Sequence, residues 1–246
     1  MKFNGDFIGD NVVSEVVGWT GGDNQEQYLT NVVNQPDDWY YKDKTITYSF
    51  NSLGHRSKEV QDLDKNNYIL FLGCSHTMGV GLELEKTFPY LISKKLECDY
   101  YNLGLPAAGV DVLEYNLLTW FAKINRAPKA IVIQWPDHSR FTSYMPEYAP
   151  DHLIECGSWA KDDNTTKLLI GSEISGLSHA RKLLTMKIIE SVVKAPIIPC
   201  IFSSQNIFTI YDLQLRQLDK ARDLAHAGIQ SNQVWSEQLI NELAKA

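Results

Sequence analysis

The sequence predicts an α/β fold in which a central parallel sheet is covered by helices on both faces. From residue 68 onward, short apolar runs alternate with segments whose apolar residues recur at helical spacing. Strands that alternate with helices form βαβ units, because consecutive parallel strands need a crossover connection. Ligands of such sheets bind beyond the carboxyl ends of the strands, so the loops after the strands are candidate sites.

The expected strands are short, apolar and bounded by glycine, proline or polar residues. Residues 68–72 (YILFL) end at a glycine, residues 100–103 give a second run, and residues 130–135 (AIVIQW) give the clearest strand pattern. Residues 197–202 lie between a proline and a serine. Helices are expected where apolar residues recur three or four positions apart. These helical segments are residues 85–96, 112–124, 174–193, 211–224 and 233–246.

The first part of the chain has a different composition. Residues 1–60 are rich in Asn, Asp, Gly, Gln and aromatic residues, with turn signals at 21–24 and 34–38 and a short alternating strand at 45–50. We therefore expect an irregular N-terminal lead-in over residues 1–60, packed on an α/β domain that spans residues 61–246.

Composition narrows the class of protein. The chain has 246 residues, is 44% hydrophobic and carries a formal net charge of -7, which is typical of a soluble globular protein. An acidic balance argues against nucleic-acid partners and anionic membranes, which require a basic face. The four cysteines are scattered, so we expect free thiols in a reducing compartment, and no metal or other cofactor is indicated.

The start of the chain shows no export signal. The segment MKFNGDFIGDNVV has acidic residues where a signal peptide needs an apolar run. We expect a cytoplasmic protein, or one delivered without a signal peptide, for example in a phage particle.

One strand ends in a segment suited to nucleophilic chemistry. After residues 68–72 the chain reads Gly73-Cys-Ser-His-Thr-Met-Gly79, which places Ser75 where a buried strand emerges. A serine hydroxyl needs a base, and the base works best when a carboxylate orients it. Asp223 and His226 are three residues apart near the C-terminus, a spacing at which their side chains can meet. They also follow the last expected strand, so they return to the same sheet edge as Ser75.

These two blocks resemble the SGNH, or GDSL-type, hydrolases, a family of esterases, lipases and carbohydrate deacetylases with a flavodoxin-like three-layer fold. The family's first block is a strand followed by Gly-Asp-Ser, matched here by Gly73-Cys-Ser75, and its last block is Asp-x-x-His, matched by Asp223-Leu-Ala-His226. The segment 51–56 (NSLGHR) also resembles one that precedes the first block in microbial and phage members. The resemblance implies that Ser75 is the nucleophile, His226 the base and Asp223 its orienter.

The middle blocks depart from the family's pattern. The second block supplies an oxyanion amide from a loop, matched here by residues 102–109, so Gly104, Ala107 or Gly109 is the expected donor. The third block normally ends in Gly-x-Asn-Asp, whose Asn side chain is a further donor. Here the strand runs into Gln134-Trp-Pro-Asp-His138 without an Asn, so Gln134 or His138 is the expected substitute.

Several of these residues have simpler interpretations. Ser75 is also suited to capping a helix, Cys74 and His76 to packing, and His226 to a surface position. A metal site that joins Asp137 and His138 to His76 lacks a second closely spaced ligand pair. The aromatic residues within 141–159 fit a sugar groove, a packed lid or a partner surface equally.

The resemblance thus implies a serine esterase, and together with the aromatic segment it favours short acyl groups, with O-acetyl groups on a carbohydrate as the suggested substrate. The expected partner is a small-molecule or glycan ester, with no nucleic acid and no membrane, and a homo-oligomer is compatible with the sequence. The alternative is a catalytically weak or inactive glycan-binding or structural subunit, for example of a virion. A nucleotide-binding protein is disfavoured because residues 73–81 contain neither a P-loop lysine nor a GxGxxG pattern.

Overall fold

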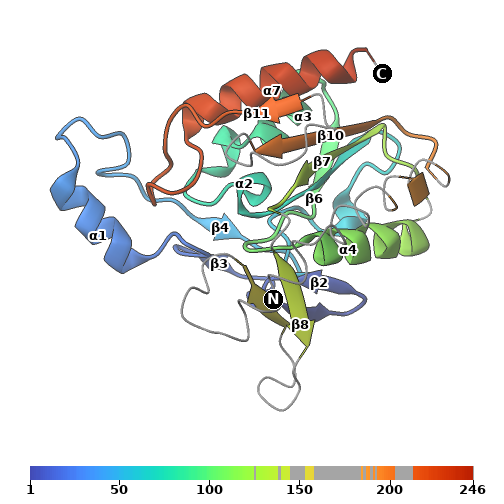
Figure 1. Ribbon diagram of the computed structural model, residues 1–246, viewed down its shortest axis with the longest axis horizontal. Coiled ribbons are helices and arrows are strands. Elements are labelled where there is room, and N and C mark those ends of the chain that lie inside the picture. Colours follow the sequence, from blue (N-terminus) through green and yellow to red (C-terminus); the bar gives the residue numbers. More distant parts are fainter. Residues whose placement is uncertain are drawn as a thin grey trace.

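The computed structural model shows a three-layer α/β protein with an extended N-terminal region (Figure 1). The residues it describes are 1–124, 126–137, 140–144, 153–157, 184, 187–188, 191, 193–202 and 213–245. Within these ranges, no helix is both long and apolar enough to cross a membrane.

A five-stranded parallel sheet forms the middle layer. Its strands are β5 (Tyr68–Leu72), β6 (Asp99–Asn102), β7 (Ala130–Trp135), β10 (Ile197–Phe202) and β11 (Leu213–Leu215). They lie in the order β11-β10-β7-β5-β6, and every pairing is parallel. Numbered along the chain this is the flavodoxin-like order 2-1-3-4-5, whose ligand-binding switch point lies between the first and third strands. The predicted fold class is therefore confirmed, and the switch point falls between β5 and β7.

Helices cover both faces of this sheet. Helix α4 (Val110–Lys123) packs on one face, and α3 (Phe88–Lys95) and α7 (Ile229–Leu243) pack together on the other (Figure 1). Strand β5 shows why both faces are filled. Leu70 and Leu72 join the core on the α4 side, whereas Ile69 and Phe71 join the core on the α3 and α7 side. Alternate residues of one strand thus enter two different cores, as a strand buried on both faces requires.

The N-terminal region contains more regular structure than expected. Strands β1 (Lys2–Asn4) and β2 (Phe7–Gly9) form a hairpin, and β3 (Val16–Val17) pairs with β4 (Tyr48–Ser49), within the expected strand 45–50. The hairpin packs on α4, where the Asn116 side chain binds both the N–H and the carbonyl of Ile8 at 2.9 and 2.8 Å.

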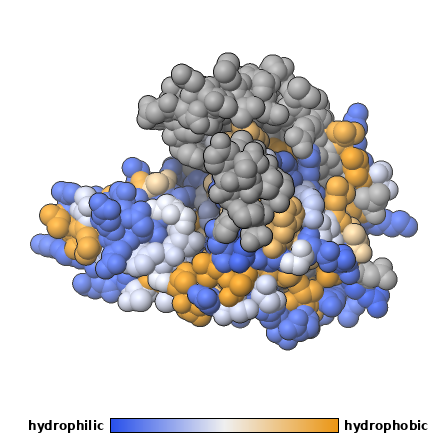
Figure 2. Space-filling model, turned by 90° about the horizontal axis from the view of Figure 1, so that it is seen from below, coloured by the Kyte–Doolittle hydropathy of each residue, from blue (hydrophilic) through white to orange (hydrophobic). Residues whose placement is uncertain are grey.

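Helix α1 (Gln25–Asn34) is an element that sequence periodicity missed. Its N-terminus is capped by Asn24, whose side chain accepts from the Gln27 N–H at 2.9 Å. Its one buried residue is the polar Asn31, while Leu29 and Val33 are exposed, so the helix lacks the fully buried apolar stripe that periodicity detects. It lies on an arm that projects from the body, and the surface of this arm is mostly hydrophilic (Figures 1 and 2).

Two of the expected helices differ from the observed elements. The helix predicted at 211–224 is wrong over its described part, because Leu213–Leu215 forms edge strand β11 and the residues after it form tight turns. Helix α7 begins at Ile229, four residues earlier than expected, where the Asp219 carboxylate accepts from the N–H groups of Gln230 and Ser231 at 2.9 and 2.8 Å. Most of the predicted helix 174–193 lies outside the described residues.

The aromatic segment 141–159 is described only over residues 141–144 and 153–157. There β8 (Phe141–Tyr144) pairs with β9 (Leu153–Cys156) in an antiparallel ribbon.

The burial of β5 on both faces leads to a prediction about stability. We expect Leu70→Ala to lower the free energy of unfolding by about 2–5 kcal/mol, because it leaves a cavity at a fully buried position. Leu118→Ala is the matched control on the outer side of α4, where the side chain is 52% exposed, and should cost less than about 0.5 kcal/mol. Urea denaturation of both variants measures the difference, and equal losses would contradict the assignment of β5 to the core.

Candidate active site

A sharp turn between β5 and α2 (Ser75–Met78) places Ser75 at the start of that short helix. Gly73 makes the turn possible, since a Cβ at this position would lie 2.0 Å from Thr77 Oγ1. Gln134, from β7, lies beneath the turn and accepts hydrogen bonds from Cys74 Sγ and Thr77 Oγ1, both at 3.2 Å. Ser75 is consequently held at the β5–β7 switch point of the sheet, with 6% of its surface exposed.

The loop between β11 and α7 carries Asp223 and His226. One carboxylate oxygen of Asp223, Oδ1, accepts from the backbone N–H groups of Ala225 and His226 at 3.1 and 3.0 Å. The other oxygen, Oδ2, is hydrogen-bonded to His226 Nδ1. Leu224, between them, has a φ of 57°, in the left-handed region that side chains other than glycine rarely adopt. The pair thus sits in a tight, locally strained loop.

The two segments meet although 151 residues separate Ser75 from His226. His226 Nε2 lies 2.7 Å from Ser75 Oγ, within hydrogen-bond distance. Because Asp223 binds the Nδ1 side of the ring, Nδ1 carries the proton and Nε2 is free to accept from the serine hydroxyl. Asp223, His226 and Ser75 therefore form a continuous hydrogen-bonded chain.

The electrostatics of Asp223 suit this arrangement. Burial of the carboxyl group raises its pKa, but the hydrogen bond and charge of His226 and the two backbone N–H donors outweigh burial. The net effect is a pKa of Asp223 below its ordinary value, so the group is ionised at neutral pH.

A second histidine lies against the first. The ring of His76 packs edge-on to that of His226, with centroids 4.9 Å apart, and its Nδ1 accepts from the Ala227 N–H at 3.4 Å. Burial, together with the neighbouring charges of His226 and Arg140, lowers the pKa of His76 to about 3. His76 is therefore neutral at physiological pH and places no positive charge beside His226.

The loop after β6 contains the three expected backbone donors, and it is tied to α2. Asn102 donates to the Thr77 carbonyl at 2.8 Å and accepts from the Gly104 N–H at 2.9 Å, so this amide is already engaged. Ala107 adopts a φ of 59°, and Gly109 is the residue that precedes α4. No hydrogen bond joins the N–H of Ser75, Ala107 or Gly109 to another described residue.

Of the two expected side-chain donors, only Gln134 is described, because His138 lies outside the described residues. Gln134 is 1% exposed, and its amide nitrogen donates to the Trp135 carbonyl at 3.0 Å. Its side chain is thus engaged in holding the turn that carries Ser75.

The turn Gly21-Gly22 forms a further wall that the sequence did not identify as part of the site. A Cβ on Gly22 would lie 3.5 Å from both Asp223 Oδ2 and His226 Cε1, and one on Gly21 would lie 3.3 Å from Pro106. The one available signal was the glycine pair itself, which indicated a turn but not its neighbours.

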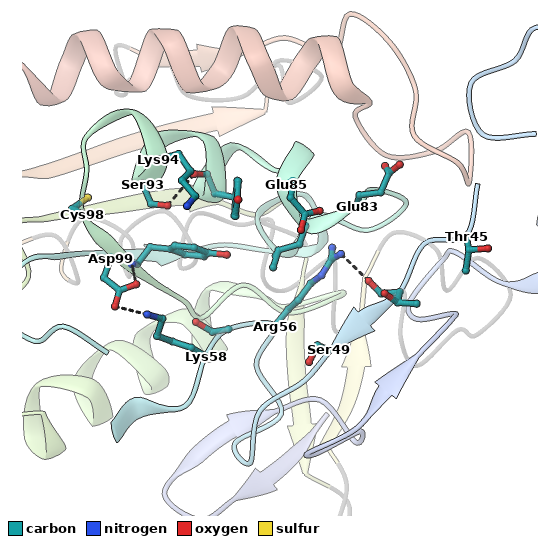
Figure 3. Close-up of a pocket in the computed structure, with 15 residues that line it drawn as sticks. Thr45, Ser49, Arg56, Lys58, Glu83, Glu85, Ser93, Lys94, Cys98 and Asp99 are labelled. Carbon is teal, nitrogen blue, oxygen red and sulfur yellow. Dashed lines mark hydrogen bonds and ion pairs between the residues drawn. The ribbon is translucent and has the colours of Figure 1, made fainter. Parts of the chain in front are cut away.

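A cavity of about 700 Å³ lies elsewhere, between β4, α3 and β6, and neither Ser75, Asp223 nor His226 lines it (Figure 3). Arg56 forms part of its lining and donates to the carbonyls of Gly79 and Leu82 at 2.7 and 2.8 Å. The cavity wall therefore also supports the segment that follows α2. Within the described ranges, no cluster of His, Cys, Asp and Glu side chains could hold a metal ion.

Comparisons with known proteins find solved structures with a similar fold. The chain matches no protein-family model and no curated protein sequence. An acetyl xylan esterase from the rumen bacterium Butyrivibrio proteoclasticus is similar in structure, with a TM-score of 0.44 and 13% identity over 73% of this chain and 64% of that chain. A carbohydrate esterase gives a TM-score of 0.44 and 14% identity over 74% of this chain and 65% of the other.

A G-D-S-L family protein from Desulfitobacterium hafniense gives a TM-score of 0.38 and 12% identity over 72% of this chain and 99% of that chain. This chain spans less than two thirds of the length of each of the two esterases. At these identities the likeness concerns the fold, and the chemistry of the site follows from its own residues.

The lowered pKa of His76 leads to a prediction about acid stability. Between the ordinary value of 6.5 and about 3, the folded chain binds fewer protons at His76 than the unfolded chain, so acidification destabilises the fold. His76→Phe keeps a ring against His226 and removes this effect. We expect its free energy of unfolding to fall less steeply than that of the wild type between about pH 6.5 and pH 4. Urea denaturation across this range measures both slopes, and equal slopes would contradict a neutral His76.

Proposed function

We propose that the protein is a serine hydrolase that cleaves ester bonds, with Ser75 as nucleophile, His226 as general base and Asp223 as the residue that orients His226. The observation that carries the proposal is the hydrogen-bonded chain from Asp223 through His226 to Ser75, with 2.7 Å between His226 Nε2 and Ser75 Oγ. A serine, a base and a carboxylate in this relation are the recurring machinery of acyl transfer.

In the proposed reaction, His226 Nε2 removes the hydroxyl proton as Ser75 Oγ attacks the ester carbonyl carbon. The resulting imidazolium gives that proton to the leaving alcohol, and an acyl group remains on Ser75. Water then attacks the acyl-enzyme with His226 again as base, which releases the acid and restores the serine. Asp223 keeps the proton on Nδ1 throughout and stabilises the imidazolium.

Backbone amides are the proposed oxyanion donors. The N–H of Ser75 lies at the first position of α2, and the loop after β6 brings further amides to the same edge of the sheet. Ala107 and Gly109 are the candidates on that loop, because the Gly104 N–H is already bound to Asn102. Loss of a single donor of this kind typically costs about 10²–10³ in rate, so a site built from backbone amides alone is expected to be slower than one with an added side-chain donor.

Short acyl esters are the proposed substrates, with O-acetyl groups on carbohydrate as the suggested natural case. Two residues without side chains, Gly21 and Gly22, lie against Pro106, Asp223 and His226, and this close approach of the backbone suits a compact acyl group. The sequence blocks that resemble SGNH hydrolases support the same class of ester substrate.

A second candidate is a glycan-binding or structural module that retains the fold without turnover. It is favoured by Gln134, which stands where the family's third block provides an Asn donor and whose amide nitrogen is bound to Trp135. This candidate predicts glycan binding that Ser75→Ala leaves unchanged, together with no ester hydrolysis by the wild type.

Hydrolysis of p-nitrophenyl acetate separates the two candidates. We expect measurable turnover by the wild type, with Ser75→Ala and His226→Ala each lowering kcat/KM by about 10³-fold or more, because each removes a member of one catalytic unit. Ser52→Ala is the matched control, since this exposed hydroxyl binds Glu59 and lies outside the site, and it should leave kcat/KM unchanged. Wild-type turnover that survives Ser75→Ala, or no wild-type turnover at all, would contradict the hydrolase proposal.

A further inference from the structure

A buried ion pair lies next to Asp223. Arg222, the preceding residue, donates from Nε to Asp23 Oδ1 and Oδ2 at 3.0 and 3.2 Å, and from Nη2 to Oδ2 at 2.6 Å. The two side chains are 2% and 1% exposed, so neither charge is solvated by water. Such multiple contacts fix the relative orientation of the two groups as well as their separation. The pair joins residues 199 positions apart and connects the lead-in to the loop that carries Asp223 and His226.

Arg222 is also held along its backbone. Its N–H donates to the Gly81 carbonyl at 3.2 Å, and its carbonyl accepts from the Asn31 side chain of α1 at 3.0 Å. The guanidinium stacks on the ring of Trp19, 4.1 Å from the ring centroid, and donates to the Gly18 carbonyl at 2.9 Å. The residue before Asp223 is thus constrained through its side chain, its N–H and its carbonyl.

The other end of the pair is anchored to the segment that follows α2. The Tyr48 hydroxyl donates to Asp23 Oδ2 and accepts from the Gly81 N–H at 2.8 Å. Burial, and then the charge of Asp23, raises the pKa of Tyr48, so this hydroxyl keeps its proton. Gly81 packs so closely that a Cβ on it would lie 2.7 Å from the Ala221 Cβ. One network therefore connects the segment after Ser75, the lead-in and the loop of His226.

We propose that Asp23 and Arg222 are positioning residues for the Ser75–His226 pair: the ion pair holds the backbone at Asp223 so that His226 meets the serine. The inference rests on the proposed hydrolase function. The φ of Leu224 lies in the left-handed region, which is unfavourable for a leucine, so support from outside the loop adds to the two N–H groups that Asp223 binds within it. The turn 20–23 supplies the carboxylate of the pair and, through Gly22, the wall against Asp223 and His226.

The expected effect is on turnover rather than on substrate binding, because the pair acts on the placement of the base. A displacement of about 1 Å in a reacting group can lower the rate by about 10²-fold. We therefore expect that loss of the pair lowers kcat by roughly 10–100-fold and changes KM by less than about twofold.

The test uses a double variant, Asp23→Asn with Arg222→Gln, because removing only one partner would leave a buried charge unpaired. Both charges are removed, and the two amides can still bind each other and the Tyr48 hydroxyl. The matched control is Lys58→Gln with Asp99→Asn, an ion pair of 2.7 Å at the cavity of Figure 3, away from Ser75. Circular dichroism and thermal melting show whether each variant is folded, and p-nitrophenyl acetate kinetics give kcat and KM separately.

The proposal is supported if the double variant is folded and has a reduced kcat with unchanged KM, while the control variant is unaffected. A folded double variant with wild-type kcat overturns the proposal and leaves the ion pair a purely structural role. A folded double variant in which KM changes and kcat does not also overturns it. If the double variant does not fold, Asp23→Glu decides instead, because it keeps the charge and displaces the carboxylate by one methylene group. Its kcat should fall, and a wild-type kcat would overturn the proposal. Absence of turnover in the wild type would instead overturn the hydrolase function itself.

Discussion

The close packing of the turn between β5 and α2 is the constraint on which the site depends. Thr77 Oγ1 occupies the space of a side chain at Gly73, and Gln134 reaches from β7 to hold Cys74 and Thr77 from below. The chain must therefore turn sharply, which holds Ser75 at the switch point between β5 and β7, beyond the carboxyl ends of these paired strands. The base, its carboxylate and the 104–109 loop are then arranged around a fixed hydroxyl.

The parts of the fold that sequence patterns predicted best are those buried on both faces. Strands β5, β7 and β10 begin and end where the apolar runs do, because a strand covered by helices on both sides is apolar throughout. Elements stabilised by polar contacts gave no such pattern. Helix α1 buries an asparagine rather than an apolar stripe, and β11 is an edge strand too short to show alternation, which is why 211–224 looked helical.

In the site, too, some residues are recognisable from short sequence patterns, whereas contacts between distant residues are not. Ser75 follows a strand, and Asp223 and His226 share a short spacing, so sequence order alone suggested all three. The ion pair of Asp23 and Arg222 has no local signature, because 199 residues separate its partners and each looks like an ordinary surface charge in sequence. Gln134 shows a further limit, since the sequence indicated that it borders the site but not that its side chain would be engaged beneath the serine.

The central claim is that His226 activates Ser75 for nucleophilic attack, and covalent labelling tests it most directly. The wild type and His226→Ala are treated with a fluorophosphonate, which reacts with an activated serine, and the modified residue is located by mass spectrometry of peptides. We expect a single adduct on Ser75 in the wild type and labelling slower by about 10³-fold or more in His226→Ala. An unmodified Ser75 in folded wild-type protein, or equal labelling of the two proteins, would contradict it.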